Sequence, residues 1–318
     1  MTRYPPLDLS KARLVSIHKR KSKENASKGV KPIRRGMTVR ELLNAMPDQL
    51  AARQLRELAD DVAQAARGNK TVIAAFGGHV VKLGLGPLLI QLMEKGVVSA
   101  VAMNGAASVH DFELAYCGKT SEDVDAALET GEFGMTEETG RCLNKAIERR
   151  PEEGMGRAVG RMIAESGWTF ADASVLAAAY RLDIPASVHV AVGTDIVHQS
   201  PHANGAHIGA ASYADFLKFA SVVAQLEGGA VLNFGSAVIM PEVFLKALAL
   251  ARNLGNRVER FAAADFDMIR SYRPAENLVR RPTSLGGKGY LITGHHEIML
   301  PLFAAAVLDA LEDGKTES

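Results

Sequence analysis

The sequence predicts an α/β fold: a doubly wound, mainly parallel sheet with helices on both faces. From residue 70 onward, short and continuously apolar segments alternate with segments whose apolar residues recur at helical spacing. Continuous apolar runs are typical of strands that are covered on both faces, as in a parallel sheet. With 318 residues, 47% of them hydrophobic, the chain is long enough for such a domain without disulfides or structural metals.

Six apolar runs are expected to form the strands, at residues 71–76, 97–103, 186–192, 230–234, 258–263 and 289–292. Helices are expected over residues 39–67, 85–95, 171–181, 213–225, 241–254 and 296–311, and in a segment that includes 110–116. Residues 118–157 are charged and rich in glycine, so we expect helical pieces and loops there.

The net charge of +1 hides a strong asymmetry along the chain. Residues 1–40 contain twelve Lys and Arg but only Asp8 and Glu24 as acids, so the rest of the chain carries −9. We therefore predict a basic N-terminal arm over residues 1–36, followed by one α/β domain over residues 37–318. Because the basic run 18–23 has no aromatic side chains or known binding module around it, we expect the arm to contact an acidic neighbour or subunit, not nucleic acid.

Cysteine usage and hydropathy predict a protein of the cytoplasm. The two cysteines, Cys117 and Cys142, do not have the spacing of a metal site, and we interpret them as packing residues in a reducing compartment. No run approaches the roughly 18 apolar residues that cross a bilayer, and the first residues lack the apolar core of a signal peptide. We therefore expect no membrane partner.

Small and polar residues follow the predicted strands, where an open parallel sheet binds its ligands. Glycine lets backbone N–H groups approach a phosphate, and a helix that begins there adds the positive end of its dipole. Although a single glycine after a strand means little, the joint pattern predicts a nucleotide-like ligand. The expected cofactor-binding residues are Gly77, Gly78, His79, Asn104, Gly105, Thr194, Gly235, Ser236, Asp265, Asp267, Gly294 and His295.

Three common motifs are absent. The dinucleotide fingerprint GxGxxG does not follow the first strand, since the pair Gly84 and Gly86 comes too late and lacks a third glycine. The phosphate-binding motif GxxxxGK[ST] and the nucleophile motif GxSxG do not occur either. A standard Rossmann dehydrogenase, a kinase and a GxSxG hydrolase are therefore disfavoured.

The segment 189–207 contains four histidines and Asp195, and closely spaced imidazoles can bind zinc. A metal-dependent hydrolase that uses His189, His198 and His202 is therefore an alternative hypothesis. However, the spacing fits no standard metal motif, and a histidine within a strand, such as His189, is more often a hydrogen-bonded core residue. We expect no metal.

Two further groups can carry amine chemistry. His110, beside Asp111 and Glu113 at the start of a helix, can exchange a proton with an amine while a carboxylate holds an ammonium group, although acidic residues are also favoured there by the helix dipole. Lys288 stands among three glycines and is either a solvated loop residue, which its type alone favours, or a mobile nucleophile that forms an imine.

The stretch 81–113 resembles part of deoxyhypusine synthase, in which a glycine-led helix and a buried strand end in a small-residue turn. It is also similar to the NAD-binding domain of archaeal-type ornithine cyclodeaminases, whose turn carries Asn-Ala, then His-Asp and Glu, then Gly-Thr-Ser. The corresponding residues are Asn104 and Gly105, His110 and Asp111, Glu113, and the segment 118–121.

The resemblance to deoxyhypusine synthase continues weakly over residues 70–312. Residues similar to the family's segments are Ile184 and Pro185, Thr194 and Asp195, Gly235 and Ser236, Asp265 to Asp267, and Lys288 near its imine-forming lysine. The chain departs from the family in three places. Glu242 follows Met240 and Pro241 where a catalytic His is expected, Gly286 and Gly287 replace a Trp, and His110 replaces a carboxylate.

The resemblance implies an NAD-dependent enzyme that makes an imine from a polyamine or a basic amino acid and then transfers, cyclises or releases it. It also implies a homo-oligomer of two or four chains. Deoxyhypusine synthesis itself is not expected, because of the departures. The implied catalytic residues are Lys288, His110 and Glu113, and the implied substrate-binding residues are Asp111, Asp195, His198, Glu242 and His296. A non-catalytic NAD-binding regulatory protein is the second alternative.

Overall fold

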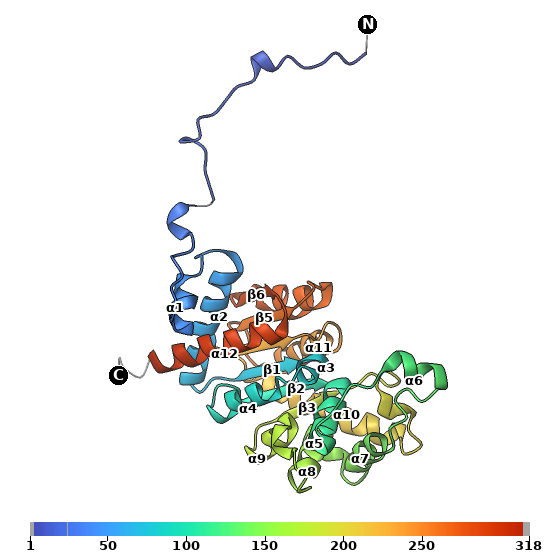
Figure 1. Cartoon of the computed structure of the whole chain (residues 1–318). Helices are drawn as coiled ribbons and strands as arrows, with labels where there is room; N and C mark the ends of the chain where they lie inside the picture. Colours follow the sequence, from blue (N-terminus) through green and yellow to red (C-terminus); the bar gives the residue numbers. More distant parts are fainter. Residues whose placement is uncertain (1–2, 24, 314–318) are drawn as a thin grey trace.

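A computed structural model describes residues 3–23 and 25–313, and within them six strands form one sheet (Figure 1). Every neighbouring pair is parallel, and the order is β3-β2-β1-β4-β5-β6. The strands are β1 (Val72–Phe76), β2 (Ala100–Asn104), β3 (Ala186–His189), β4 (Ala230–Phe234), β5 (Ala262–Asp267) and β6 (Lys288–Thr293). The predicted doubly wound α/β fold is confirmed.

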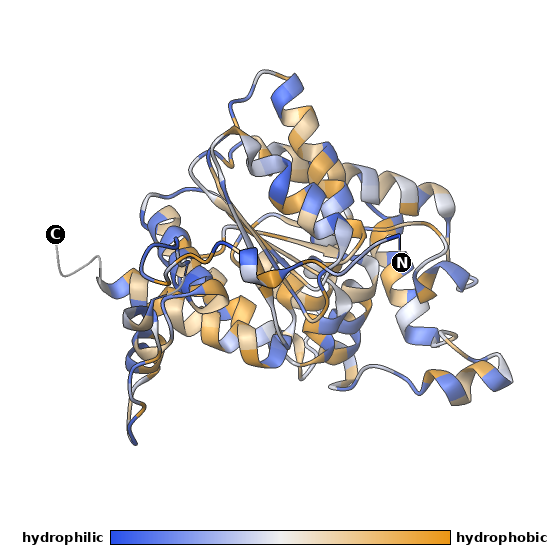
Figure 2. Cartoon of the chain, turned by 90° about the horizontal axis from the view of Figure 1, so that it is seen from above, coloured by the Kyte–Doolittle hydropathy of each residue, from blue (hydrophilic) through white to orange (hydrophobic). Residues whose placement is uncertain are grey.

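Helices cover both faces of the sheet, as Figure 2 shows from above. The first face is packed by α1 (Val39–Ala45), α2 (Leu50–Arg67), α3 (Gly78–Lys82), α4 (Gly86–Glu94), α5 (Gly105–Cys117), α8 (Met155–Ala164), α9 (Val175–Arg181) and α12 (His296–Asp313). The second face is packed by α11 (Ile239–Asn253), the π-helix η6 (Pro274–Arg280) and the later part of α10 (Gly205–Val223), whose Ile208 and Ala211 belong to the first core. On β1, Ala74 and Phe76 belong to the first core and Ile73 and Ala75 to the second. The central strands are apolar throughout because both faces are buried.

Two further helices, α6 (Val124–Thr130) and α7 (Glu137–Glu148), lie in the segment expected to hold helical pieces and loops. The short 3-10 helices are η1 (Leu9–Lys11), η2 (Ala26–Lys28), η3 (Pro151–Glu153), η4 (Ala171–Ala173), η5 (Ile196–Gln199) and η7 (Pro282–Leu285). None of the described helices is both long enough and apolar enough to cross a membrane.

The structure corrects several predicted boundaries. The helix expected over residues 39–67 is two helices, because Met46 precedes Pro47 and adopts an extended ψ of 153°; a residue before proline is disfavoured in helical conformation. The strand expected over 258–263 is β5, which begins only at Ala262. Val258 and Phe261 are buried, but in the loop that leads to it. The helix expected from residue 213 begins at Gly205, where the side chain of Asn204 caps it.

The N-terminal residues lie apart from the sheet and its helices. Between residues 3 and 27, every described residue is exposed, and the segment extends away from the body beside α1 (Figure 1). Two backbone hydrogen bonds, from Lys31 to Ala45 and from Asp48 to Lys28, attach its last part to the end of α1.

Glycines at the contact between α8 and α9 provide a test of how tightly the fold is packed. A Cβ added to Gly160 would lie 2.4 Å from the Leu176 carbonyl oxygen, whereas a Cβ added to Gly209 on α10 would meet nothing within 4 Å. We expect Gly160→Ala to destabilise the protein by about 1–2 kcal/mol, because overpacking outweighs the gain in helix propensity. The matched variant Gly209→Ala should stabilise it by about 0.5–1 kcal/mol. Urea unfolding measures both, and shifts of the same sign would contradict this packing.

Candidate functional site

The six strands end at one edge of the sheet because all of them are parallel. At the centre of that edge, β1 and β4 are neighbours, and the helices that follow them cover opposite faces: α3 packs in the first core and α11 in the second. In open α/β sheets of this strand order, such a switch point is where ligands bind. The structure therefore has a preformed crevice site at the ends of β1 and β4.

Two glycines bring the backbone segments at the switch point into contact. A Cβ on Gly77 would lie 2.6 Å from the Gly235 carbonyl oxygen, and a Cβ on Gly235, whose φ is +67°, would lie 2.5 Å from His296 Nε2. The His296 side chain is buried, its Nδ1 has no hydrogen-bond partner among the described residues, and its ring lies 5.9 Å from that of His79. These contacts bring together Gly77, Gly235, His79 and His296, four of the residues expected at the strand ends.

A buried polar pair lies beside the switch point at the ends of β4 and β5. The Asn233 side chain donates to Asp265 Oδ1 at 2.7 Å and to the Ser236 carbonyl at 3.0 Å, while its own Oδ1 has no partner in the described chain. Burial raises the pKa of Asp265 to about 6. Asp267 accepts a hydrogen bond from the backbone of Met268.

Some of the expected cofactor-binding side chains are used for local structure. Asn104 Oδ1 accepts from the Ala107 N–H and caps α5, and Ser236 Oγ accepts from the Met240 N–H at the start of α11. Gly294 donates its N–H to the Asp267 carbonyl, and His295 is exposed. The backbone of these residues lies at the strand ends, and Asn104 Oδ1 and Ser236 Oγ each already accept a local hydrogen bond.

A cavity of about 600 Å³ adjoins the ends of β2 and β3. Among the residues expected to form the site, His110, Glu113, Thr194 and Asp195 line this cavity, but Lys288 and Asp111 do not. Sequence reasoning assigned no role to several others that line it, chiefly Lys82, Lys119, Thr120, Glu122, Phe133 and Thr136. Lys82 follows Gly78 by about one helical turn, and Lys119 lies within the resemblance segment, so these two had a signal in the sequence.

His110 is held in one tautomer by a short chain of hydrogen bonds. Thr120 Oγ1 donates its only proton to Glu113 Oε2 at 2.5 Å and lies 2.7 Å from His110 Nδ1. The hydroxyl oxygen can then only accept from the imidazole, so Nδ1 carries the proton and Nε2 keeps its lone pair. Glu113 also accepts from Thr139 Oγ1 at 3.0 Å. Glu113 thus positions His110 through Thr120, and both of its oxygens are occupied.

The surroundings of His110 favour its neutral form. Burial lowers the pKa of His110, the positive charge of Lys82 lowers it further, and the negative charge of Glu113 opposes both. A neutral imidazole with a free Nε2 is a general base near neutral pH.

Asp195 and His198 form a second polar pair at the cavity wall. Their side chains are only 6% and 5% exposed, and Asp195 Oδ2 lies 3.9 Å from His198 Nε2, where neither atom has a hydrogen-bond partner among the described residues. His198 Nδ1 accepts from the backbone N–H groups of Gly193 and Asp195, so Nε2 carries the proton. Burial raises the pKa of Asp195 to about 6.

The structure does not bring Lys288 to this site. Lys288 is the first residue of β6, and its Nζ lies 2.6 Å from Asp61 Oδ1 on α2, beside a different cavity of about 420 Å³. The carboxyl end of β6 is five residues away, about 17 Å at roughly 3.3 Å per residue. The expectation that Lys288 is catalytic is therefore corrected: the glycines before it lead into the strand from the opposite edge of the sheet.

Asp111 is a structural residue and not a substrate contact. It is 1% exposed and accepts hydrogen bonds from Ser174 Oγ at 2.6 Å and from the N–H groups of Val175 and Leu176 at 2.8 and 3.2 Å. It therefore caps the start of α9. Neighbouring helix residues point about 100° apart, so when His110 faces the cavity Asp111 turns into the core. Burial raises the pKa of Asp111 to about 6.

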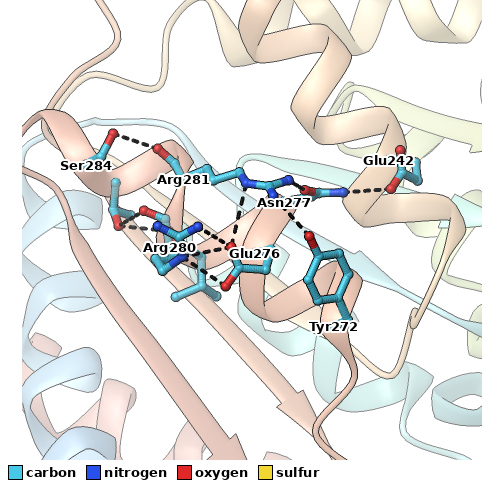
Figure 3. A network of polar contacts seen from close by, with 9 residues as sticks. Glu242, Tyr272, Glu276, Asn277, Arg280, Arg281 and Ser284 are labelled. Carbon is cyan, nitrogen blue, oxygen red and sulfur yellow. Dashed lines mark hydrogen bonds and ion pairs between the residues drawn. The ribbon is translucent and has the colours of Figure 1, made fainter.

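Glu242 also lies outside the cavity. As Figure 3 shows, it accepts from Asn277 Nδ2 at 2.7 Å, next to a network in which Arg281 donates to Asn277 and Tyr272. Glu242 also pairs with Lys246 and with Arg273, and the hydrogen bond from Lys246 is the main reason that the pKa of Glu242 is lowered. Its charge is thus neutralised where α11 meets η6, which corrects its expected substrate role.

The histidines expected in a metal-dependent hydrolase do not form a site. His189 is buried and lies 2.9 Å from Ser187 Oγ, and burial lowers its pKa to about 4. His202 is exposed. Across residues 3–23 and 25–313, no three His, Cys, Asp or Glu side chains come together to hold a metal ion.

Comparison with known proteins identifies relatives of the fold only. No family model matches the sequence, and no curated protein matches it significantly. The chain is similar to AgrE, solved in a ternary complex with ornithine and NAD+, with a TM-score of 0.51 and 16% identity over 86% of this chain and 35% of AgrE. The chain is also similar to a putative LOR/SDH protein from Methanococcus maripaludis S2. The TM-score is 0.51 and the identity is 16%, over 84% of this chain and 71% of that protein.

A putative deoxyhypusine synthase from Entamoeba histolytica gives a TM-score of 0.48 and 12% identity over 86% of this chain and 94% of that protein. The chain spans about a third of the length of AgrE. The shared fold with AgrE and the LOR/SDH protein confirms the Rossmann-like architecture that the sequence resemblance implied.

The structural role of Asp111 can be tested by measuring the stability of a variant that lacks its carboxylate. We expect Asp111→Ala to lower the free energy of unfolding by about 2–4 kcal/mol, because two buried N–H groups and a hydroxyl lose their acceptor. The control is Asp172→Ala, which removes a carboxylate whose side chain is 98% exposed and should cost less than about 0.5 kcal/mol. Urea unfolding measures both variants. Unchanged stability of Asp111→Ala would return this residue to the list of ligand contacts.

Proposed function

We propose that the chain is an NAD-dependent enzyme that acts on the amine of a basic amino acid and forms an imine. The observation that carries this proposal is a neutral His110, fixed by Thr120 and Glu113, in a cavity beside the carboxyl edge of a doubly wound sheet. This is the arrangement in which a base removes a proton next to a cofactor bound at the strand ends.

Several features of the strand ends fit a dinucleotide. Gly77 and Gly235 leave no side chain between the backbone segments at the switch point, and the buried atoms Asn233 Oδ1 and His296 Nδ1 still lack partners in the described chain. These residues, with Ser236 and Asp265, would hold NAD. When bound, NAD supplies hydride acceptance, which an unactivated amine needs before it can become an imine. AgrE, which shares the fold, was solved with NAD+ and ornithine, and this supports the proposal.

The residues of the chain supply the proton chemistry. An amine substrate arrives as an ammonium ion, and His110 Nε2 accepts one proton from it, which leaves a nitrogen lone pair that can form the C=N bond. The imidazolium that results is stabilised by Glu113 through Thr120. Asp195 lines the same cavity, and its carboxylate would hold a second ammonium group.

The charges of the cavity favour an amino acid over a polyamine. Lys82 and Lys119 both line it, and neither forms an ion pair with another described residue. Acidic groups line the same cavity: Glu113, Glu122 and Asp195. A basic amino acid presents one carboxylate and two ammonium groups, so it matches both signs of charge, whereas a polyamine would place its charges near the two lysines.

The rest of the proposal concerns organisation. Residues 37–318 form one catalytic domain, and the protein acts as a homo-oligomer. Whether the imine is transferred, cyclised or released depends on its next reaction partner. A regulatory protein that binds NAD without turnover is the competing hypothesis, and turnover decides between them.

The first prediction for this function concerns His110. With ornithine, lysine and arginine as candidate substrates, the purified chain should produce NADH, measured by absorbance. His110→Gln should lower kcat by about 10²- to 10⁴-fold, because a general base is lost. Lys288→Ala should leave kcat unchanged.

The pH dependence has a definite sign. His110 must be neutral to accept a proton, so kcat/KM should fall as the pH is lowered through the pKa of His110. Because burial lowers this pKa, the fall should occur below the usual value of 6.5.

A loss of activity in Lys288→Ala with normal activity in His110→Gln would contradict the assignment of His110 as the base. Tight NAD binding without turnover of any amine would favour the regulatory hypothesis.

The second prediction concerns the substrate carboxylate. Lys82→Met should raise KM for the amino-acid substrate by about 10- to 100-fold, the loss expected for a charge-assisted hydrogen bond. KM for the diamine made by removing that carboxylate should not rise. The control is Lys95→Met, an exposed lysine at the end of α4 that does not line the cavity. Equal effects of Lys82→Met on both substrates would show that this lysine does not bind a carboxylate.

A further inference from the structure

An acidic segment borders the cavity and has no basic partner. Within residues 120–132, which we call the acidic segment, the charged residues are Glu122, Asp123, Asp125, Glu129 and Glu132, with no Lys or Arg. Asp123 caps α6, and Glu122 accepts from the Gly134 N–H, but none of the five forms an ion pair with any residue that the structure describes. The acidic segment thus carries a concentrated negative charge beside the cavity, and these like charges repel one another.

The helix within this segment also has an uncovered apolar side. α6 has only seven residues, none of them buried, and it projects from the body (Figure 1). Val124, Ala127 and Leu128 have the spacing of one helix face, and Val124 and Leu128 are 45% and 64% exposed. An isolated helix of this length is unstable in water without tertiary packing. α6 therefore presents a surface that a partner both apolar and positively charged would complement.

The N-terminal arm has this composition. Residues 3–35 contain eleven Lys and Arg against two acids, and in the described part only Lys11 is paired, with Asp8 at 3.7 Å. Its apolar side chains are also uncovered: Leu7, Leu14 and Ile17 are 90%, 94% and 64% exposed. The arm and the acidic segment are thus complementary in charge, and both have apolar side chains to bury.

The position of the arm indicates a second copy of the chain. The arm leaves the body beside α1, which packs against α12, whereas α6 projects on the other side of the molecule (Figure 1). We propose that residues 7–23 of one chain bind the acidic segment of a second copy. The basic side chains face the α6 carboxylates, and the apolar ones cover Val124 and Leu128. Because Glu122 and Val124 line the cavity, the docked arm forms part of its wall.

The strength of this contact depends on several pairs acting together. A single exposed ion pair contributes little to binding, so no one substitution should abolish the contact. Salt screens such pairs, since the Debye length falls from about 10 Å at 0.1 M to about 3 Å at 1 M. Burial of the apolar side chains of Leu7 or Leu14 adds a contribution to the binding free energy that does not depend on salt.

A cross-linking experiment between two preparations tests the proposal on the full chain. Both carry Cys117→Ser and Cys142→Ser; one carries Ser22→Cys in the arm, and the other carries Ala126→Cys on α6 and a size tag. Mixed at 0.1 M salt with a short bis-maleimide, they should give a cross-linked heterodimer, and its yield should fall at 1 M salt. The readout does not depend on NAD or on any amine, so it is independent of the proposed function.

Charge reversal provides the matched control. Lys19→Glu, Arg20→Glu and Lys21→Glu together should lower the heterodimer yield by about tenfold, which corresponds to about 1.4 kcal/mol. Asp125→Lys with Glu129→Lys on the other preparation should restore it, whereas the reversals Glu94→Lys and Asp172→Lys should not. Absence of the heterodimer at 0.1 M salt, or a yield that the charge reversals leave unchanged, would overturn the second-copy partner. An arm that binds an oligonucleotide but gives no heterodimer would overturn the proposal in favour of nucleic acid.

Discussion

The backbone contact between Gly77 and Gly235 determines the geometry of the whole carboxyl edge. Because neither residue has a side chain, β1 and β4 end against each other, and their helices leave toward opposite faces of the sheet. His296, at the start of α12, closes over the same point. The candidate cofactor crevice, the neighbouring cavity and the buried polar groups of β4 and β5 all take their positions from this contact.

Burial at this edge controls protonation. His110 and Asp195 lie in the same cavity wall, yet burial shifts their pKa values in opposite directions: that of His110 falls and that of Asp195 rises. Both shifts have the same cause, the cost of placing a charge away from water. A neutral base and a carboxyl group whose pKa is raised to about 6 therefore line one cavity without strong mutual attraction.

The fold and part of the site could be predicted from the sequence, and the rest depended on contacts between distant segments. Apolar runs located the central strands, since β4 extends over the expected residues and β1 differs by one. The helical context of His110 was also recognisable. The position of Lys288 was not, because glycines precede both loops and strands, and only pairing with Ala262 shows that this lysine begins β6 at the far edge.

The other differences between the predicted and the observed site arise from contacts between residues far apart in the sequence. Asp111 looked like an ammonium ligand because it adjoins His110, but its partners are Ser174 to Leu176, more than 60 residues away. Lys82 and Lys119 lie near sequence features that stand out, the glycine turn and the resemblance segment, but only the folded cavity brings the two lysines together. Such tertiary contacts carry no periodic signal, and so local patterns could not assign these residues.

The measurement that tests the central claim most directly is a crystal structure of the protein soaked with NAD. The account predicts density for the dinucleotide along the carboxyl ends of β1 and β4, against Gly77 and Gly235, with its nicotinamide ring toward the cavity that holds His110. Density at the opposite edge, beside Lys288 and Lys70, or a carboxyl edge that stays free of nucleotide at saturating NAD, would contradict it.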